Sequence, residues 1–380
     1  MTTAETDEQT KPRQGEAGPG FSFFSREGFA RTFRSGGRAP DVTYRWNVLC
    51  LDGKTGDVVW ERLAREDRPT IPIHRSNSYA SETPVIDGER LYVYFGMTGL
   101  FCYDLAGQLL WNREIGAFPM QYGWGTGSSP IVYGERVFLV CDNEQESFLV
   151  AFDKRSGAEV WRVHRNEKSN WVTPFVWHNS VRDELVVAGG EKVRSYDPEN
   201  GELLWEREAT GRCATTPVAD QELLYVGSVT RSRGGSGELI AIRTGAEGDL
   251  GSESNVGANS AIAWSVPRVA PELASPLLYQ GCLYALSQHG GIIRCFDAKT
   301  GQRHYRKRLP GAGGFTASPW ASNGKVFCLD ENGKTHVLEA GTKLNVLGTN
   351  ELDEMFWSSP AVVGENLLLR GVEHLYCIGS

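Results

Sequence analysis

The side chains that could do chemistry in this sequence lie mostly just before a set of regularly spaced prolines. The sequence around these prolines is a repeated motif, and Glu82 is a carboxylate at a position where the other copies of the motif have Ser, Thr or Ala. Asp142, Asn143 and Glu144 offer three consecutive oxygen-bearing side chains, which hard cations prefer as ligands. Together with nearby aromatic residues, such groups could bind a small polar molecule, a sugar or a peptide. The candidate ligand-binding residues are Tyr79, Glu82, Trp124, Asp142, Asn143, Glu144, Trp171, Arg212 and Trp357.

The same residues also have a structural interpretation. The aromatic side chains could fill the centre of the fold without binding a ligand, and the seven histidines show no metal-ligand spacing. The segment 121–130, QYGWGTGSSP, combines aromatic residues with three glycines, which allow close approach of the backbone. The sequence therefore assigns no catalytic residue and no metal ligand.

Small hydroxyl residues take the equivalent places in the other copies, and they fit a narrow, water-filled channel. They are Ser81, Ser128, Ser129, Thr173, Thr215, Thr216, Ser275, Ser318, Ser358 and Ser359.

Two repeated sequence motifs alternate along the chain, and the elements that they form must position these side chains. One ends in an Asp turn followed by an aromatic residue, and its clear copies are 49–60, 101–111, 150–161, 193–205 and 293–305. Weaker copies are 239–245, 336–346 and 375–379, which makes eight. The second motif follows prolines 84, 130, 174, 217, 276, 319 and 360. A unit of about 45 residues with four short β segments is typical of a propeller blade.

Each repeated residue has a local structural task. The Asp carboxylate can accept backbone N–H groups two residues on, and Gly in Asp-x-x-Thr-Gly can adopt positive φ. The tryptophans at 60, 111, 161, 205 and 264 are expected to pack between neighbouring blades. Four of the eight cysteines share one slot, which elsewhere holds Ala, Ser or Val, so we expect a small buried side chain there.

The two motifs occur in different numbers, since there are eight copies of the motif with the Asp turn and seven copies of the motif that follows a proline. We therefore expect an all-β, eight-bladed β-propeller of four-stranded antiparallel blades that is incomplete at its N-terminus. Residues 1–43 form a polar irregular segment, either a long loop or the remnant of a first blade, and 44–380 form the propeller. Residues 1–4 resemble the end of a second strand. Missing strands would come from sequence upstream of Met1, or residues 1–45 would supply unusual closing strands.

Composition excludes some classes of function. The net charge of −8 makes nucleic acid an unlikely partner, because no basic patch is present to neutralise phosphates. No run of about 18 apolar residues predicts a membrane span. The N-terminus has no signal-peptide pattern, so the compartment stays open; a truncated N-terminus would favour the periplasm or bacterial envelope.

The combination of the two motifs resembles the PQQ-like β-propeller repeat over residues 44–379. This repeat is shared by quinoprotein alcohol dehydrogenases and by BamB, a propeller lipoprotein of outer-membrane protein assembly. The resemblance implies a pyrroloquinoline quinone and Ca²⁺ site in the first group and a protein-binding scaffold in the second. The chain has no adjacent cysteine pair, and no counterpart of the quinoprotein metal ligands or catalytic base stands out.

The leading hypothesis is therefore a monomeric, non-catalytic scaffold that binds protein or peptide partners, similar to BamB. The alternative is a PQQ- and Ca²⁺-dependent quinoprotein oxidoreductase, or a propeller that binds another small ligand. The repeat itself does not decide between them, because its defining residues serve turns and packing.

Overall fold

The computed structural model describes residues 1–7, 38–74, 77–208, 214–228, 237–251, 260–269, 271 and 273–379. The chain forms two compact units, residues 1–174 with 199–201 and residues 175–198 with 202–380. No helix in the described part of the chain has the length and apolar composition needed to cross a bilayer.

The first unit contains three blades. Blade 1 has β1 (Thr2–Glu5), β2 (Tyr44–Leu51) and β3 (Val58–Asp67). Blade 2 has β4 (Val85–Ile86), β5 (Arg90–Tyr94), β6 (Leu100–Asp104) and β7 (Leu109–Arg113), with the 3₁₀ turn η1 (Gly96–Thr98). Blade 3 has β8 (Ile131–Tyr133), β9 (Arg136–Cys141), β10 (Ser147–Asp153) and β11 (Glu159–Arg165).

The second unit contains five blades. Blade 4 has β12 (Phe175–His178), β13 (Asp183–Ala188), β14 (Lys192–Tyr196) and β15 (Leu203–Glu208), and blade 5 has β16 (Val218–Ala219), β17 (Leu223–Ser228), β18 (Glu238–Arg243) and β20 (Ile262–Pro267). Blade 6 has β21 (Leu277–Tyr279), β22 (Cys282–Leu286), β23 (Ile292–Asp297) and β24 (Arg303–Arg308). Blade 7 has β25 (Trp320–Ser322), β26 (Lys325–Leu329), β27 (Lys334–Glu339) and β28 (Val346–Glu351), and blade 8 has β29 (Ala361–Val363), β30 (Asn366–Arg370) and β31 (Leu375–Ile378).

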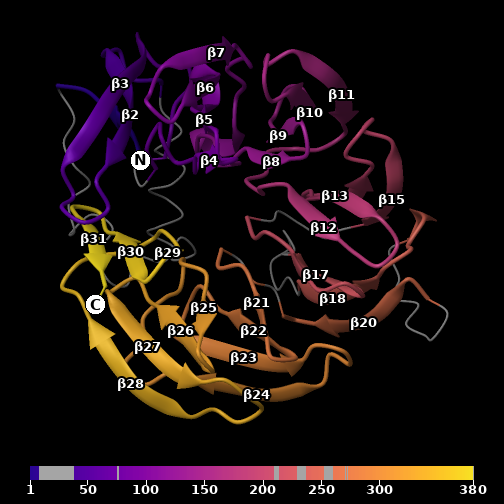
Figure 1. The fold of residues 1–380 in the computed structure, drawn as a ribbon. Coiled ribbons are helices and arrows are strands. Elements are labelled where there is room, and N and C mark those ends of the chain that lie inside the picture. Colours follow the sequence, from indigo (N-terminus) through magenta and orange to yellow (C-terminus); the bar gives the residue numbers. More distant parts are fainter. Residues whose placement is uncertain are drawn as a thin grey trace. The chain divides into compact units, whose positions relative to one another are not determined.

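The fold is an all-β, eight-bladed β-propeller with mostly four-stranded antiparallel blades, as the repeat predicts. In each blade the strands follow one another in chain order, so that each blade is one meander, and Figure 1 labels most of them. Blades 1 and 8 each have three strands among the described residues. Thr2–Glu5 is not irregular: it pairs antiparallel with β2, in the place of a second strand.

The Asp turn has the predicted hydrogen bonds. The Asp52 carboxylate accepts the backbone N–H groups of Lys54 and Thr55 at 2.8 and 2.9 Å, and Gly56 has φ of +78°. This closes the hairpin between the third and fourth strands without strain, since glycine adopts positive φ readily.

Four of the five predicted tryptophans, Trp60, Trp111, Trp161 and Trp264, pack on the turn glycine of the next blade, which confirms the predicted packing for them. Trp205 differs, because its indole N–H donates to Glu184 of its own blade and no tryptophan atom lies within 4 Å of a Cβ on Gly245.

The Trp111 indole N–H donates to the Lys154 carbonyl oxygen at 3.2 Å. A Cβ on Gly157 would lie 2.6 Å from the Trp111 ring, and one on Gly107 would lie 2.8 Å from the Trp60 ring. The glycine is therefore required both by its φ and by the ring that lies against it.

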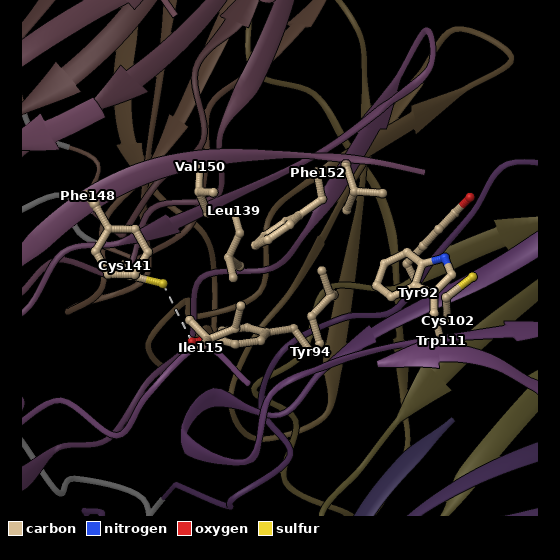
Figure 2. Close-up of a cluster of buried hydrophobic side chains, with 12 residues drawn as sticks. Tyr92, Tyr94, Cys102, Trp111, Ile115, Leu139, Cys141, Phe148, Val150 and Phe152 are labelled. Atoms are coloured by element: carbon tan, nitrogen blue, oxygen red, sulfur yellow. Dashed lines mark hydrogen bonds between the residues drawn. The ribbon is translucent and has the colours of Figure 1, made fainter. Parts of the chain in front are cut away.

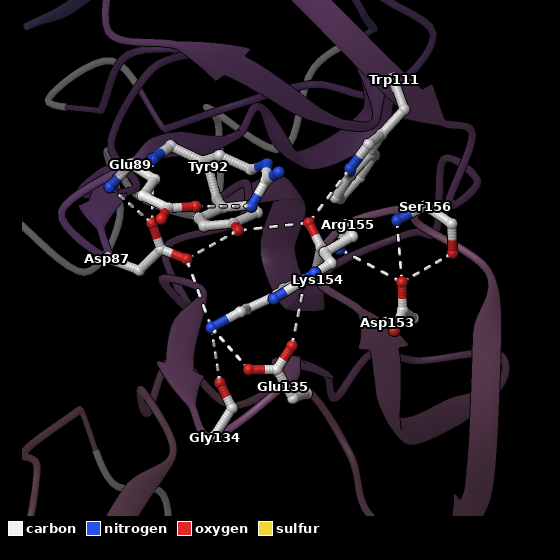
Figure 3. A network of polar contacts seen from close by, with 11 residues as sticks. Asp87, Glu89, Tyr92, Trp111, Gly134, Glu135, Asp153, Lys154, Arg155 and Ser156 are labelled. Carbon is white, nitrogen blue, oxygen red and sulfur yellow. Dashed lines mark hydrogen bonds and ion pairs between the residues drawn. The ribbon is translucent and has the colours of Figure 1, made fainter.

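Polar contacts strengthen the junction between blades 2 and 3 (Figure 3). The Tyr92 hydroxyl donates to Asp87 Oδ2 at 3.0 Å and to the Lys154 carbonyl oxygen at 3.2 Å. The Lys154 ammonium lies 3.7 Å from Asp87 and 3.0 Å from Glu135. This network joins the turn between β4 and β5 of blade 2 to two turns of blade 3.

One of the core clusters of the first unit lies between the same two blades (Figure 2). Tyr94, Leu139, Phe148 and other side chains from β5 to β10 form one buried apolar cluster. Cys102 in this cluster and Cys295 in blade 6 are fully buried, as the cysteine slot predicts. The prediction is wrong for Cys50, which is half-buried, and for Cys377, which is exposed.

Hydroxyl residues directly before five of the prolines accept a hydrogen bond from the neighbouring blade, a role that the repeat alone does not predict. In the first unit, Ser129 Oγ accepts the N–H of Thr83 at 2.8 Å, and Thr173 Oγ1 accepts the N–H of Ser129 at 3.1 Å. In the second unit, the same bond joins Ser275 to Ser318 at 2.9 Å and Ser318 to Ser359 at 2.8 Å. These hydroxyls link successive blades, because each satisfies a backbone N–H that a short inner strand leaves open.

The long insertion after Gly234 is partly described. Its residues Gly248–Asp249 form β19, which pairs in parallel with β15 of blade 4 and makes that sheet five-stranded. The insertion therefore covers part of an outer strand edge in the second unit.

Candidate functional site

The segment 121–130 in the first unit has an unusual backbone. It includes the 3₁₀ turn η2 (Gln121–Gly123), and Tyr122 has φ of +55°, which non-glycine residues seldom adopt. A Cβ on Gly125, which has φ of +80°, would lie 2.7 Å from Ile73 Cγ2. The glycines seen in the sequence therefore let this segment turn tightly against its neighbours.

Hydrogen bonds from three directions hold the segment in place. Asn77 Nδ2 donates to the Trp124 carbonyl oxygen at 2.8 Å. The Trp171 indole N–H donates to the Gly125 carbonyl oxygen, also at 2.8 Å, and the Gln121 N–H donates to Ser169 Oγ at 2.8 Å. The segment is thus fixed to the residues before β4 and before β12.

Three aromatic rings meet on this fixed backbone. The ring centroids of Tyr122 and Trp124 are 5.4 Å apart, and those of Trp124 and Trp171 are also 5.4 Å apart. Tyr122 is 41% exposed, whereas the two tryptophans are half-buried. We call Tyr122, Trp124 and Trp171 the aromatic surface. It presents apolar area on a preorganised loop, as protein and peptide binding sites commonly do.

Glu82 lies buried behind the same segment. The Thr126 hydroxyl donates to Glu82 Oε1 at 2.5 Å, and only 3% of Glu82 is exposed. Burial raises the pKa of the Glu82 carboxyl to about 7, although the hydrogen bond from Thr126 acts in the opposite direction. Glu82 is therefore a titratable group inside the protein that is directly coupled to the loop.

Asp142 forms an ion pair in the interior. Both its carboxylate oxygens accept hydrogen bonds from Arg165, from Nε at 2.8 Å and from a terminal nitrogen at 3.1 Å. Neither side chain is exposed to solvent. The pair joins the end of β9 to the end of β11.

The other two members of the predicted cation site are also engaged with protein groups. Asn143 Oδ1 accepts the backbone N–H groups of Gln145 and Glu146, and Glu144 Oε1 accepts both the N–H and the hydroxyl of Ser169. A cation would have to displace these donors and the Arg165 guanidinium. Within the described ranges, no three His, Cys, Asp or Glu side chains come together in a way that could hold a metal ion.

A small cavity lies next to these groups, with a volume of about 20 Å³, room for about one water molecule. Thr126, Ser128, Asp142 and Asn143 are among the residues that line it. The buried Ser128 hydroxyl has no hydrogen-bond partner among the described residues, so one water molecule here would satisfy it.

The remaining predicted site residues lie elsewhere. The Tyr79 hydroxyl donates to the Ile71 carbonyl oxygen at 2.8 Å, and the ring is buried in the core beside Trp46, so Tyr79 is a packing residue. Trp357 is half-buried in the second unit. Arg212 lies outside the described residues. The structure thus brings Glu82, Trp124, Asp142, Asn143, Glu144 and Trp171 around one segment.

The candidate residues chosen from the sequence omit Tyr122, Thr126, Arg165 and Ser169, although the segment 121–130, which contains the first two, stands out in the sequence. Tyr122 stands between Gln121 and a glycine, and a Tyr-Gly pair inside a glycine-rich segment was the available sign of an unusual turn. Arg165 ends a fourth strand, and nothing in its local sequence indicates a buried partner.

Known proteins resemble this chain in both sequence and structure. Residues 26–146 and 121–346 match the family model described as "Outer membrane protein assembly factor BamB". The outer membrane protein assembly factor BamB of Bordetella pertussis is 25% identical over 300 residues, which cover 78% of this chain and 72% of the relative. The quinoprotein alcohol dehydrogenase PedH of Pseudomonas putida is 37% identical, but over only 20% of this chain and 13% of the relative.

Two solved structures share the fold. BamB from Moraxella catarrhalis superposes with a TM-score of 0.62 at 13% identity and covers 88% of this chain and 89% of its own. A europium-containing methanol dehydrogenase superposes with a TM-score of 0.56 at 10% identity, covering 87% of this chain and 79% of its own. At these identities the likeness shows the fold alone.

Proposed function

Because this chain belongs to the family described as outer membrane protein assembly factor BamB, we propose that it is a non-catalytic scaffold that binds protein or peptide partners in outer membrane protein assembly. The extent of the matches supports this function over the alternatives. The relative from Bordetella pertussis is matched over 72% of its length, whereas the quinoprotein PedH is matched over 13%.

The observation that carries the proposal is the aromatic surface. Tyrosine and tryptophan are enriched at the centres of protein interfaces, where they bury large areas at a small entropic cost. Tyr122 holds its ring outward at a φ of +55°, a conformation that costs free energy and needs support from its surroundings. The hydrogen bonds from Asn77 and Trp171 supply that support, so the rings are already placed for a partner.

Quinoprotein chemistry does not fit the candidate site in the first unit. The cavity has room for about one water molecule, far less than a tricyclic quinone requires. The carboxylate that could ligate Ca²⁺, Asp142, is bound on both oxygens by Arg165, and Glu82 is turned toward Thr126. We therefore derive no reaction through PQQ at this site.

The proposal carries expectations for compartment and assembly state. A partner in outer membrane assembly requires this chain to work in the bacterial envelope. We propose that it works there as a monomer that contacts its partner through the aromatic surface.

The proposal can be tested by site-specific photo-crosslinking in cells. A benzophenone amino acid replaces Tyr122 in one variant and Leu109 in a control, since Leu109 is 47% exposed on the outer strand β7 of the same unit. We expect position 122, and not 109, to give a discrete product that contains an envelope protein of outer membrane assembly. The same products from both positions, or none from position 122, would overturn the proposal.

A further inference from the structure

The outer strand of blade 6, β24, is strongly basic, although the chain as a whole has a net charge of −8. Its sequence is RHYRKR, without an acidic residue. All its arginine and lysine residues are exposed, and no carboxylate of the described chain forms an ion pair with any of them. They are Arg303, Arg306, Lys307 and Arg308.

Blade 4, in the same unit, offers an internal comparison. The residue in the cysteine slot of its third strand, Ser195, faces Trp205 of its fourth strand. In blade 6, Cys295 faces Tyr305 in the same way. The third and fourth strands of the two blades can therefore be compared residue by residue.

The next pair in this register has opposite charges in blade 4 and like charges in blade 6. Arg194 faces Glu206, and its Nε lies 3.1 Å from the Glu206 carboxylate. In blade 6, Arg294 faces Arg306 instead. Like charges directly opposite each other on neighbouring strands are destabilising. Folding alone therefore favours an acidic residue at position 306.

Position 308 shows the same reversal of charge. Arg308 stands where blade 4 has Glu208. Charged side chains on an outer strand also hinder unwanted pairing with other strands, but either sign of charge does this. Protection of the strand therefore gives no reason for arginine at both positions, and binding of an anionic partner does.

The arrangement of the bases suits a flat anionic surface. Arg306 and Arg308 lie on one face of the strand, and Lys307 lies on the other. With Arg303, they spread over about 17 Å of an outer strand. Such a row can contact many anionic groups at once, whereas a single small anion would meet only part of it.

The surroundings of β24 favour a lipid surface over an acidic protein. Between Leu203 and Val346, no large apolar side chain of the described chain is exposed. Protein interfaces commonly have an apolar centre. Adsorption to an anionic membrane needs only basic side chains close to the headgroups.

We propose that β24 docks blade 6 onto the surface of an anionic membrane, with its four exposed bases against the lipid phosphates. The attraction grows with each base, and it acts over about 8 Å at physiological salt, so acidic groups farther away on the chain oppose it weakly. The proposal does not rest on the aromatic surface, which lies in the first unit, whereas β24 lies in the second.

Vesicle sedimentation with the full chain tests the proposal. The probes are vesicles of phosphatidylcholine alone and vesicles that also contain about 40% phosphatidylglycerol, both in about 50 mM NaCl. We expect at least about tenfold tighter binding to the anionic vesicles, and a loss of at least about tenfold in about 500 mM NaCl, because salt screens the attraction. Equal binding to both kinds of vesicle would overturn the proposal.

A charge-reversal variant tests whether β24 is the surface that binds. Arg306→Glu with Arg308→Glu gives blade 6 the charges of blade 4, so Arg294 gains an acidic partner and the variant should unfold at the same or a higher urea concentration. We expect it to bind anionic vesicles at least about tenfold more weakly.

A matched control makes the same change in net charge elsewhere. Lys54→Glu with Lys343→Glu alters exposed turns of blades 1 and 7, and it should change vesicle binding by less than about threefold. If the two double variants bound equally, another surface would be responsible and the proposal would be wrong.

Two further measurements separate this inference from other partners. If a polyglutamate peptide bound at least about tenfold more tightly per charge than the anionic vesicles, the partner would be an acidic protein and the proposal would fall. The Tyr122→Gly variant should bind vesicles as the wild type does, which separates this inference from the proposed function.

Discussion

The hydroxyl of Thr126 donates a 2.5 Å hydrogen bond to the carboxylate of Glu82, and this single contact joins the buried inner end of blade 2 to the segment that carries the aromatic surface. A Cβ on Gly96 would lie 2.2 Å from Thr126 Oγ1, so the close approach of these groups also requires glycine in η1. The loop that presents Tyr122 is therefore tied to a buried acid.

Glu82 should make stability depend on pH. Burial raises its pKa from 4.5 to about 7 in the folded protein, so its contribution is fully present below pH 4.5 and is lost as the pH rises through 7. The full difference corresponds to about 3 kcal/mol. Glu82→Gln should remove this decline in urea unfolding free energies measured between pH 4.5 and 8.

The neighbours of Glu82 do not titrate in that range. Burial raises the pKa of Tyr94, and it raises that of Cys141 to about 12, so both stay neutral. The exposed Glu61→Gln variant should keep the pH dependence of the wild type. A decline of the same size in Glu82→Gln would show that another group is responsible.

The hydroxyl links between blades should contribute measurably to stability. Ser318→Ala removes the acceptor for the Ser275 N–H, and we expect a loss of about 1 kcal/mol in unfolding free energy. Ser322→Ala, at an exposed position in β25, should change it by less than about 0.5 kcal/mol. If the two variants were equally stable in urea titrations, the hydroxyl would have no linking role.

Two turn glycines separate backbone strain from packing. Gly134 and Gly157 have φ of +56° and +67°, but a Cβ on Gly134 would meet no atom within 4 Å, whereas one on Gly157 would lie 2.6 Å from Trp111. Alanine at either position costs about 1–2 kcal/mol from the left-handed backbone. Gly157→Ala should cost about 1–3 kcal/mol more, from overpacking against the indole. Equal losses in thermal unfolding would contradict the packing role of the tryptophan.

The buried ion pair should be costly to break on one side. Arg165→Met leaves the Asp142 carboxylate buried without its cation, and we expect a loss of about 3–5 kcal/mol. Arg155→Met, whose side chain is 68% exposed beside Glu135, should lose less than about 1 kcal/mol. The double variant Asp142→Leu, Arg165→Met should recover much of the stability. If Arg165→Met were as stable as Arg155→Met, the pair would not be buried in solution.

The sequence predicts the parts of the fold that repeat. The Asp turn at Asp52 and the packing of Trp111 recur at a fixed spacing, so each copy supports the others. The contacts of the candidate site do not repeat. Thr126 and Glu82 are 44 residues apart, and Arg165 and Asp142 are 23 apart, so these pairs depend on how particular blades and strands pack. The positive φ of Tyr122 likewise follows from its neighbours and not from its own residue type.

The most direct test of the central claim is the affinity of the Tyr122→Gly variant for the partner identified by crosslinking. Glycine suits the φ of +55°, so relief of about 1–2 kcal/mol of left-handed backbone strain offsets the about 0.4–1 kcal/mol that glycine costs through the unfolded chain. The variant should therefore stay folded while it loses the ring. By titration calorimetry we expect the variant to bind its partner at least tenfold more weakly than the wild type. Unchanged affinity in the folded variant would contradict a binding role for the aromatic surface.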